Sequence, residues 1–141
     1  MTPEQLDKVL KAARGWVGTP YAHNCAIKGV GVDCGRILIE IFTEAGMIER
    51  PDCGQYAMNF MVHRGDNQYL EMVERFADEI EQAQALAGDI AVWRIGRTYS
   101  HGALMIGDGK ILHSNRADGC AVEDRLDRYF GHPVKFYRVR G

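Results

Sequence analysis

Apolar residues recur every three to four positions near the start of the chain, which is the spacing of one helical face. They are Leu6, Val9, Leu10 and Ala13. Thr2 can cap a helix, Pro3 suits its first position, and Gln5 completes a capping box. Gly15 is typical of a helix end. The sequence therefore predicts an amphipathic helix from Thr2 to about Arg14.

A second run, from Asp33 to Ala45, is apolar around more than one helical stripe. Its apolar members are Ile37, Leu38, Ile39, Ile41, Phe42 and Ala45. A strand is the rival interpretation, because the run is rich in β-branched residues, but its length and the closing Gly46 favour a helix. We expect this helix to be buried on most sides.

The pattern changes twice more along the chain. Residues 51–66 are rich in turn formers, and helical spacing then recurs from Tyr69 and predicts a helix that ends near Ala87. After Gly88, short β-prone runs follow at 90–95, 101–106, 110–115, 120–123 and 134–139, with a helical turn at 125–130. Helices first and strands later predict an α+β fold with an antiparallel meander.

Composition narrows the class of protein. The 141 residues are 46% hydrophobic and 26% charged, which predicts a single domain over 1–141. A net charge of -2 argues against an extended nucleic-acid surface. We see no signal peptide and no membrane-spanning run, so we expect synthesis in the cytoplasm without an export signal. The cysteines form no Cys-x-x-Cys pair and are expected to be free thiols; they are Cys25, Cys34, Cys53 and Cys120.

Cys34 is the candidate nucleophile. It follows the glycine-rich approach Gly29-Val-Gly-Val-Asp33 and precedes the apolar run. In the first turn of a helix, free N–H groups and the helix dipole would lower the pKa of its thiol, and an adjacent imidazolium would help hold the sulfur ionised. Packing as a small core residue is the alternative, and position alone leaves both interpretations open.

Two histidines stand on neighbouring strands. His101 opens one run and His113 closes the next, with Gly107-Asp-Gly109 between them. A two-residue turn that pairs Gly107 with Lys110 would set the two imidazoles on opposite faces. A three-residue loop would set His113 opposite Ala103, on the face of His101, where one imidazole can act as a base and the other orient it.

Five landmarks in order resemble the NlpC family of bacterial cell-wall cysteine peptidases, which belong to the papain-like superfamily. They are Gly18-Thr-Pro-Tyr21, Gly31-Val-Asp-Cys34, Gly88-Asp89, Ser100-His101-Gly-Ala-Leu and Gly107-Asp-Gly-Lys-Ile-Leu-His113. The resemblance implies a papain-like fold with N-terminal helices packed on an antiparallel sheet. It also implies a triad in which Cys34 is the nucleophile, His101 the base and acid, and His113 the orienting residue.

The same resemblance implies a substrate and the residues that bind it. The family cleaves peptidoglycan stem peptides, typically between D-γ-glutamyl and a diamino acid, through a thioester and without metal or cofactor. Tyr21 and Asp33 match family positions beside the nucleophile, although Tyr21 can simply pack and Asp33 can simply cap the helix. Relatives carry Ser after the cysteine and Gly-Gly after Pro-Tyr, whereas this chain has Gly35 and Ala22-His-Asn24, so His23 can reach the substrate pocket.

This short chain resembles the family members that phages and prophages encode in their tail-assembly regions. That resemblance implies phage tail proteins as partners and action at the cell wall. Three alternatives stay open. The chain can be an inactive tail or assembly component with the same fold, a papain-like acyltransferase, or a zinc module built from its cysteines and histidines. The cysteine spacing matches no common zinc pattern.

Overall fold

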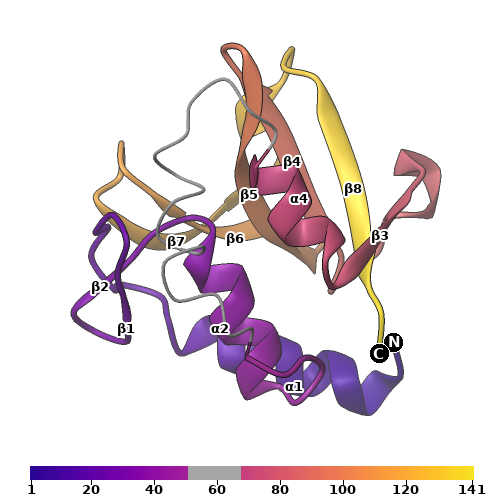
Figure 1. Cartoon of the computed structure of the whole chain (residues 1–141), viewed down its shortest axis with the longest axis horizontal. Coiled ribbons are helices and arrows are strands. Elements are labelled where there is room, and N and C mark those ends of the chain that lie inside the picture. The colour runs from indigo at the N-terminus through magenta and orange to yellow at the C-terminus, as the bar shows by residue number, and fades with distance from the viewer. Residues whose placement is uncertain (51–67) are drawn as a thin grey trace.

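A computed structural model describes residues 1–50 and 68–141. The helices are α1 (Pro3–Arg14), α2 (Arg36–Glu44) and α4 (Gln68–Glu74), with 3-10 turns η1 (Gln82–Gln84) and η2 (Leu126–Tyr129). The strands are β1 (Ala26–Ile27), β2 (Gly31–Val32), β3 (Ala77–Ile80), β4 (Ile90–Ile95), β5 (Thr98–Gly107), β6 (Lys110–Asn115), β7 (Cys120–Arg125) and β8 (Val134–Val139). Strands β3 to β8 form one antiparallel sheet in the order β3-β8-β4-β5-β6-β7, and α1 and α2 lie together beneath it (Figure 1). The predicted α+β class is confirmed.

Helix α1 begins as its sequence predicts. The side chain of Thr2 accepts a hydrogen bond from the backbone N–H of Gln5 at 3.1 Å, and the side chain of Gln5 accepts one from Thr2 N–H at 2.9 Å. This reciprocal pair satisfies two N–H groups that the first helical turn leaves unpaired. The helix ends at Arg14, with Gly15 as its C-cap.

Helix α2 confirms the helical interpretation of the apolar run, but it begins at Arg36 and not at Asp33. One carboxylate oxygen of Asp33 accepts hydrogen bonds from the N–H groups of Gly35 (3.1 Å) and Arg36 (2.8 Å). Cys34 therefore lies in the turn that this carboxylate holds, just before the helix. The side chains of Ile37, Leu38, Ile39, Ile41 and Phe42 are buried, as expected for a helix covered on most sides.

The helix predicted from Tyr69 to Ala87 is wrong beyond its first two turns. Helix α4 ends at Glu74, and the chain then forms β3, which pairs with β8. Ala77 packs with the helices, whereas Ile80 packs in the core on the other face of the sheet. Positions three apart share a helical face but lie on opposite faces of a strand. The apolar spacing was therefore interpreted as helical, although this segment forms a strand. The turn-rich prediction for 51–66 lies outside the described residues.

Strands β4 to β8 confirm the five predicted strands; β4 to β7 form the antiparallel meander, whereas β8 returns to pair with β4 and β3. Gly107 pairs with Lys110 across a two-residue turn in which Asp108 and Gly109 have positive φ angles of 55° and 69°. Of the two alternatives, the turn is therefore the two-residue one. A β-bulge at Ile106 shifts the pairing, however, so that Leu104 lies opposite Leu112. The bulge supplies the extra residue that a three-residue loop would have supplied, and it places His113 on the face of His101.

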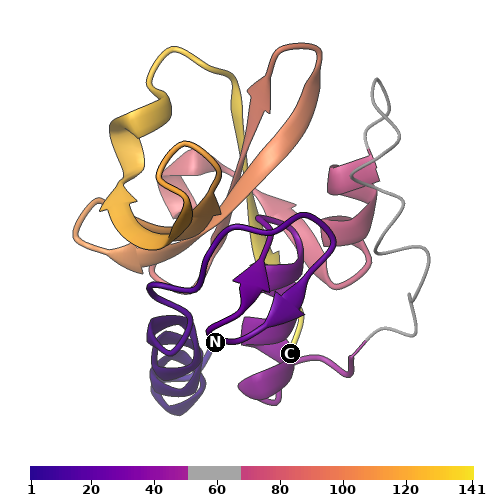
Figure 2. The ribbon, with the colours of Figure 1, turned by 90° about the vertical axis from the view of Figure 1, so that its left-hand side faces the viewer.

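The sheet separates two hydrophobic cores. Its inner face packs against α1, α2 and α4 through Ile90, Val92, Leu104, Leu112 and Tyr137. Its outer face carries Ala91, Trp93, Ala103, Ile111 and Phe136, which η2 and the segment after it partly cover. Figure 2 shows the two helices α1 and α2 below the sheet and the η2 segment beside its strands.

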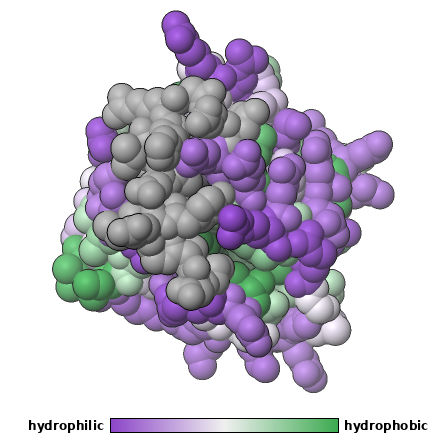
Figure 3. All heavy atoms as spheres, in the orientation of Figure 1, coloured by the Kyte–Doolittle hydropathy of each residue, from purple (hydrophilic) through white to green (hydrophobic). Residues whose placement is uncertain are grey.

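The surface fits this arrangement. Hydrophilic side chains cover most of the coloured part of the face in Figure 3, with small hydrophobic patches between them. Within the described part of the chain, no helix has both the length and the apolar character needed to cross a membrane.

Candidate active site

Cys34 lies between α2 and strand β5. Its thiol donates a hydrogen bond to the carbonyl oxygen of Ser100 at 3.7 Å, and the backbone N–H of Gly102 also bonds to the sulfur. Ser100 has no partner in the β4–β5 register, because a bulge sets Trp93 opposite His101 and Arg94 opposite Tyr99. The sulfur is therefore held by the backbone on both sides of His101.

Tyr69 of α4 fixes the backbone of the cysteine. Its hydroxyl donates to the carbonyl oxygen of Cys34 at 2.8 Å, in a fully buried position. A Cβ atom on Gly102 would lie 2.2 Å from this hydroxyl and 2.8 Å from two ring carbons. Glycine at 102 therefore provides the space in which Tyr69 meets both β5 and the turn before α2.

The thiol is protonated in this structure, contrary to the sequence expectation. Burial, with a further contribution from the charge of Asp33, raises the pKa of Cys34 to about 12. The side chain is only 4% exposed. The expected stabilisation of a thiolate by the helix end is weak here because the Asp33 carboxylate already occupies the N–H groups of Gly35 and Arg36.

His101 and His113 form a hydrogen-bonded pair. Nε2 of His101 lies 2.7 Å from Nδ1 of His113, and the two rings meet edge to face at 73°. Burial first, and then the nearby His113 and Arg128, lower the pKa of His101 to about 3. His101 is thus a neutral imidazole, not the imidazolium that the sequence analysis expected. No hydrogen bond from a described residue engages its Nδ1 nitrogen.

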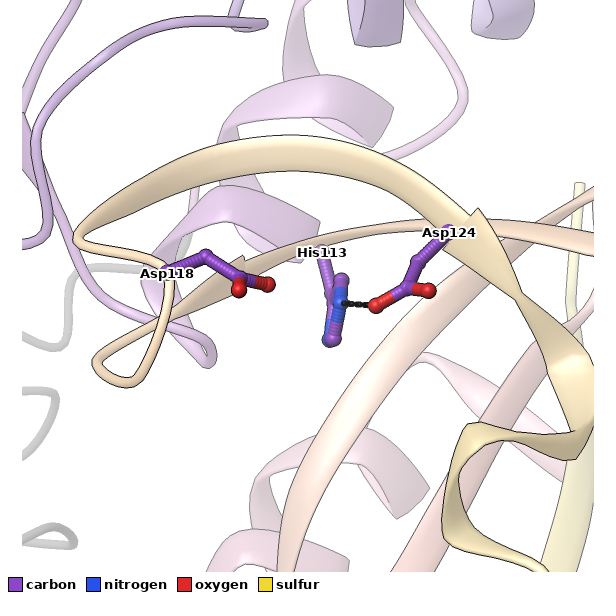
Figure 4. Close-up of side chains that lie close together, drawn as sticks. All are labelled: His113, Asp118 and Asp124. Atoms are coloured by element: carbon purple, nitrogen blue, oxygen red, sulfur yellow. Dashed lines mark hydrogen bonds and ion pairs between the residues drawn. The ribbon is translucent and has the colours of Figure 1, made fainter.

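A carboxylate that the sequence analysis missed continues this pair. Nε2 of His113 lies 3.1 Å from Oδ2 of Asp124, and the imidazole of His113 is fully buried (Figure 4). Arg128 Nη1 contacts the same carboxylate oxygen and lies 2.5 Å from Oδ2 of Asp118. His113, Asp118 and Asp124 have the residue types of a metal site, but the guanidinium of Arg128 already supplies a positive charge between the two carboxylates.

Aromatic rings surround the histidine pair. The ring of Trp93 stacks on His101 at 6.2 Å between centroids, and the ring of Tyr129 lies 5.1 Å from that of His101. Both aromatic residues also line a pocket of about 800 Å³ whose other walls include Phe130, Val134 and Phe136. The two rings that contact His101 thus also form part of the wall of an apolar pocket on the outer face of the sheet.

Strand β6 also ties the cysteine segment to the histidines. The hydroxyl of Ser114, the residue after His113, donates to the carbonyl oxygen of Val32 at 2.7 Å. Both residues are fully buried. This hydrogen bond joins residues 82 positions apart and fixes β2, two residues before the thiol, against the strand that carries His113.

The three residues expected to bind substrate differ in their placement. Tyr21 is half-buried under the guanidinium of Arg116, which lies 5.4 Å from its ring centroid. Burial first, and then the proximity of Cys34 and Asp33, raises the pKa of Tyr21. Asp33 is fully buried, with its carboxylate on the backbone N–H groups of Asn24, Gly35 and Arg36, which is the capping alternative. His23 is exposed in the turn before β1.

The residues missed by sequence reasoning had weak signals. Tyr69 resembled any apolar position on a helical face, and Gly102 resembled any glycine in a strand. Asp124 lay outside the predicted strand, which stopped at Glu123, whereas β7 continues to Arg125 and pairs Asp124 with Ile111. Extending that strand by one residue would have set Asp124 diagonal to His113 on one face.

The fold and the site together define a class. An antiparallel sheet with helices on one face, a cysteine before a helix and a histidine pair on the adjoining strands are features of the papain-like α+β fold. A family model described as the NlpC/P60 family matches residues 18–138. The chain therefore belongs to the NlpC/P60 family, a family of peptidoglycan hydrolases that also has non-catalytic members. The suspected resemblance is confirmed.

Solved structures agree on the fold. The NlpC/p60 domain of the peptidoglycan hydrolase SagA has 18% identity and a TM-score of 0.65 over 96% of this chain and 98% of that chain. A Staphylococcus aureus protein described as similar to lipoprotein, NLP/P60 family, has 22% identity and a TM-score of 0.73 over 100% of this chain but 43% of its own. RipD of Mycobacterium tuberculosis, described as a non-catalytic NlpC/p60 domain protein adapted to peptidoglycan binding, has 17% identity and a TM-score of 0.66 over 96% and 98%. No curated protein sequence matches the chain.

Proposed function

We propose that this chain is a cysteine endopeptidase that hydrolyses peptidoglycan stem peptides at the bond between D-γ-glutamyl and a diamino acid. Cys34 is the nucleophile, His101 the general base and acid, and His113 the residue that orients His101. The observation that carries this proposal is the 2.7 Å contact between His101 and His113, beside a thiol held by the backbone on both sides of His101.

The neutral state of both groups determines the order of proton transfer. Because the thiol and the imidazole are uncharged at rest, the proton of Cys34 moves to Nδ1 of His101 as the sulfur bonds to the carbonyl carbon. Backbone N–H groups near Cys34 stabilise the oxyanion that forms. The proton on His101 then passes to the leaving amine, and a thioester remains. Water hydrolyses the thioester with His101 again acting as the base.

Tyr21 and its neighbour Arg116 are the residues that we propose to contact the substrate. Stem peptides carry free carboxylates, and Arg116 holds an exposed guanidinium over the Tyr21 ring. We assign Tyr21 to the wall of the substrate cleft. A contact of Asp33 with substrate, which the family resemblance implies, stays a prediction. So does a contact of His23, which follows from the departure from the family pattern at 22–24.

A digest of defined stem peptides tests this function. Purified protein should release the diamino-acid fragment from a γ-D-glutamyl peptide, and mass spectrometry identifies the bond cut. Cys34→Ala should abolish release, whereas Cys120→Ala removes a free thiol in β7 and should leave the rate unchanged. Release that persists in the Cys34→Ala protein would sink the proposal.

A second candidate is binding of peptidoglycan without cleavage. It is favoured by the burial of Cys34, whose raised pKa leaves little thiolate for attack. Co-sedimentation with purified cell walls measures binding, and the digest measures turnover. Equal binding by the wild-type chain and Cys34→Ala, with no fragment from either, would support this candidate against the endopeptidase.

Two further expectations belong with this proposal. A papain-like acyltransferase would pass the same thioester to an amine, so a digest with added amine should yield an amide product in place of free acid. Association with a phage tail, and action at the cell wall, follow from the sequence resemblance. Detection of the chain in purified particles tests that association.

A further inference from the structure

The buried His113 receives a hydrogen-bonding partner on each ring nitrogen. Nδ1 faces His101 at 2.7 Å, and Nε2 faces the Asp124 carboxylate at 3.1 Å. The neighbouring groups on every adjoining element are His101 on β5, Asp124 on β7, Asp118 in the β6–β7 connection, and Arg128 with Tyr129 on η2. The environment thus contains two carboxylates and one guanidinium.

Arg128 keeps Asp124 ionised. Although partial burial favours the neutral acid, hydrogen bonds from Arg128, Arg125 N–H and His113 lower the pKa of Asp124 overall. Hydrogen bonds to Asp118 and then to Asp124 raise the pKa of Arg128. An ionised carboxylate can only accept hydrogen bonds, so Nε2 of His113 carries the proton in this contact.

The proton positions then follow along the chain of contacts. A neutral imidazole has one N–H, so Nδ1 of His113 must be an acceptor if Nε2 is the donor. The 2.7 Å contact to His101 then requires a proton on Nε2 of His101. Nδ1 of His101 is left with a free electron pair. In the opposite arrangement, Nδ1 of His101 would carry the proton and could not accept one from Cys34.

We propose that Asp124, held by Arg128, is a positioning residue that fixes the tautomer of His113 and, through it, the tautomer in which His101 can act as a base. This inference rests on the proposed function for its role in catalysis. The position of the proton on each imidazole ring can, however, be measured without any substrate turnover.

Long-range ¹H–¹⁵N spectra of the labelled protein near neutral pH test the proton positions, because protonated and unprotonated ring nitrogens differ in ¹⁵N shift. In the wild type, both histidines should carry the proton on Nε2. In Asp124→Asn, the amide can donate to Nε2, and the proton of His113 should appear on Nδ1. Asp127→Asn is the matched control, because Asp127 is exposed in η2, one position before Arg128, and pairs with Arg125.

Cleavage provides the second readout. Asp124→Asn should lower kcat by about 10²- to 10⁴-fold with little change in KM, the pattern of a wrong tautomer at an intact site. Asp127→Asn should leave both unchanged. Circular dichroism checks that each variant is folded, and Asp124→Ser replaces Asp124→Asn if the amide prevents folding.

The two readouts separate two kinds of failure. If Asp124→Asn retains the wild-type ¹⁵N pattern, the positioning role is overturned whatever the activity. If the ¹⁵N pattern changes as expected but the wild type releases no fragment from stem peptides, the tautomer assignment stands and the proposed function fails.

Discussion

The hydroxyl of Tyr69 occupies the space that a side chain at Gly102 would need, with only 2.2 Å between that oxygen and an ideal Cβ. Gly102→Ala should therefore displace Tyr69 and break its hydrogen bond to the Cys34 carbonyl. We expect a loss of about 1–3 kcal/mol in unfolding free energy, measured by urea denaturation. In a Tyr69→Ala background, the same glycine substitution should cost little, since the clashing ring is gone.

A suitable control adds a Cβ where the backbone and the neighbours tolerate it. Gly15 has a right-handed helical conformation, and its closest neighbour is the end of the flexible Lys28 side chain. Gly15→Ala should change stability by less than about 1 kcal/mol. Equal losses at positions 15 and 102 would contradict the assigned role of Gly102.

Removal of the Ser114 hydroxyl should loosen β2. Ser114→Ala removes the 2.7 Å hydrogen bond to the buried carbonyl of Val32, which keeps only the bond from Ala22 N–H at 3.2 Å, at a cost of about 0.5–1.5 kcal/mol. Thr43→Val is the matched comparison, because the buried hydroxyl of Thr43 has no partner among the described residues. Thermal unfolding should show a lower Tm for Ser114→Ala and an unchanged or higher Tm for Thr43→Val.

The free energy of unfolding should fall at alkaline pH because the thiol of Cys34 is buried. Burial raises the pKa of Cys34 from 9.0 to about 12, so above pH 9 the folded chain retains a proton that the unfolded chain releases. The stabilisation is complete below pH 9 and is lost as pH rises toward 12. Near pH 10, one pH unit above the ordinary pKa, the wild type should lose about 1.4 kcal/mol relative to Cys34→Ser. Parallel urea titrations at neutral and alkaline pH measure this difference, and no change in it would show that the thiol is not buried.

His101 should remain neutral in mild acid. Its pKa of about 3 lies below the ordinary value of 6.5, so the folded chain excludes a proton that the unfolded chain binds. The stability linked to this difference is complete above pH 6.5 and is lost as pH falls toward 3. In NMR spectra, the Cε1–H signal of His101, assigned with His101→Asn, should not move between about pH 5 and pH 8. A midpoint near 6.5 would contradict the buried, neutral imidazole.

Local patterns predicted much of this fold. The capping box of α1 and the meander from β4 to β7 depend on residues close together in the chain, and these predictions are confirmed. The segment after Glu74 was assigned to the wrong element because β3 exists only through pairing with β8, some 60 positions later. The spacing of apolar residues cannot report such a distant partner.

The site was predictable only in part. Cys34, His101 and His113 stand at motif positions, and the structure brings their segments together. The protonation of the site was not predictable, because it depends on burial and on how the Asp33 carboxylate uses the N–H groups before α2. The side chains that hold the site in place, Tyr69 and Asp124, belong to elements whose extents were misjudged.

Strand β8 lies between β3 and β4 in the sheet, although it follows both in the chain. During synthesis, every residue of the candidate site leaves the ribosome before β8 does. Until β8 inserts, one edge of β4 stays open and β3 has no strand to pair with. The strand that closes the sheet therefore emerges after the whole candidate site, so a nascent chain stalled before β8 would expose two unpaired strand edges to neighbouring nascent chains.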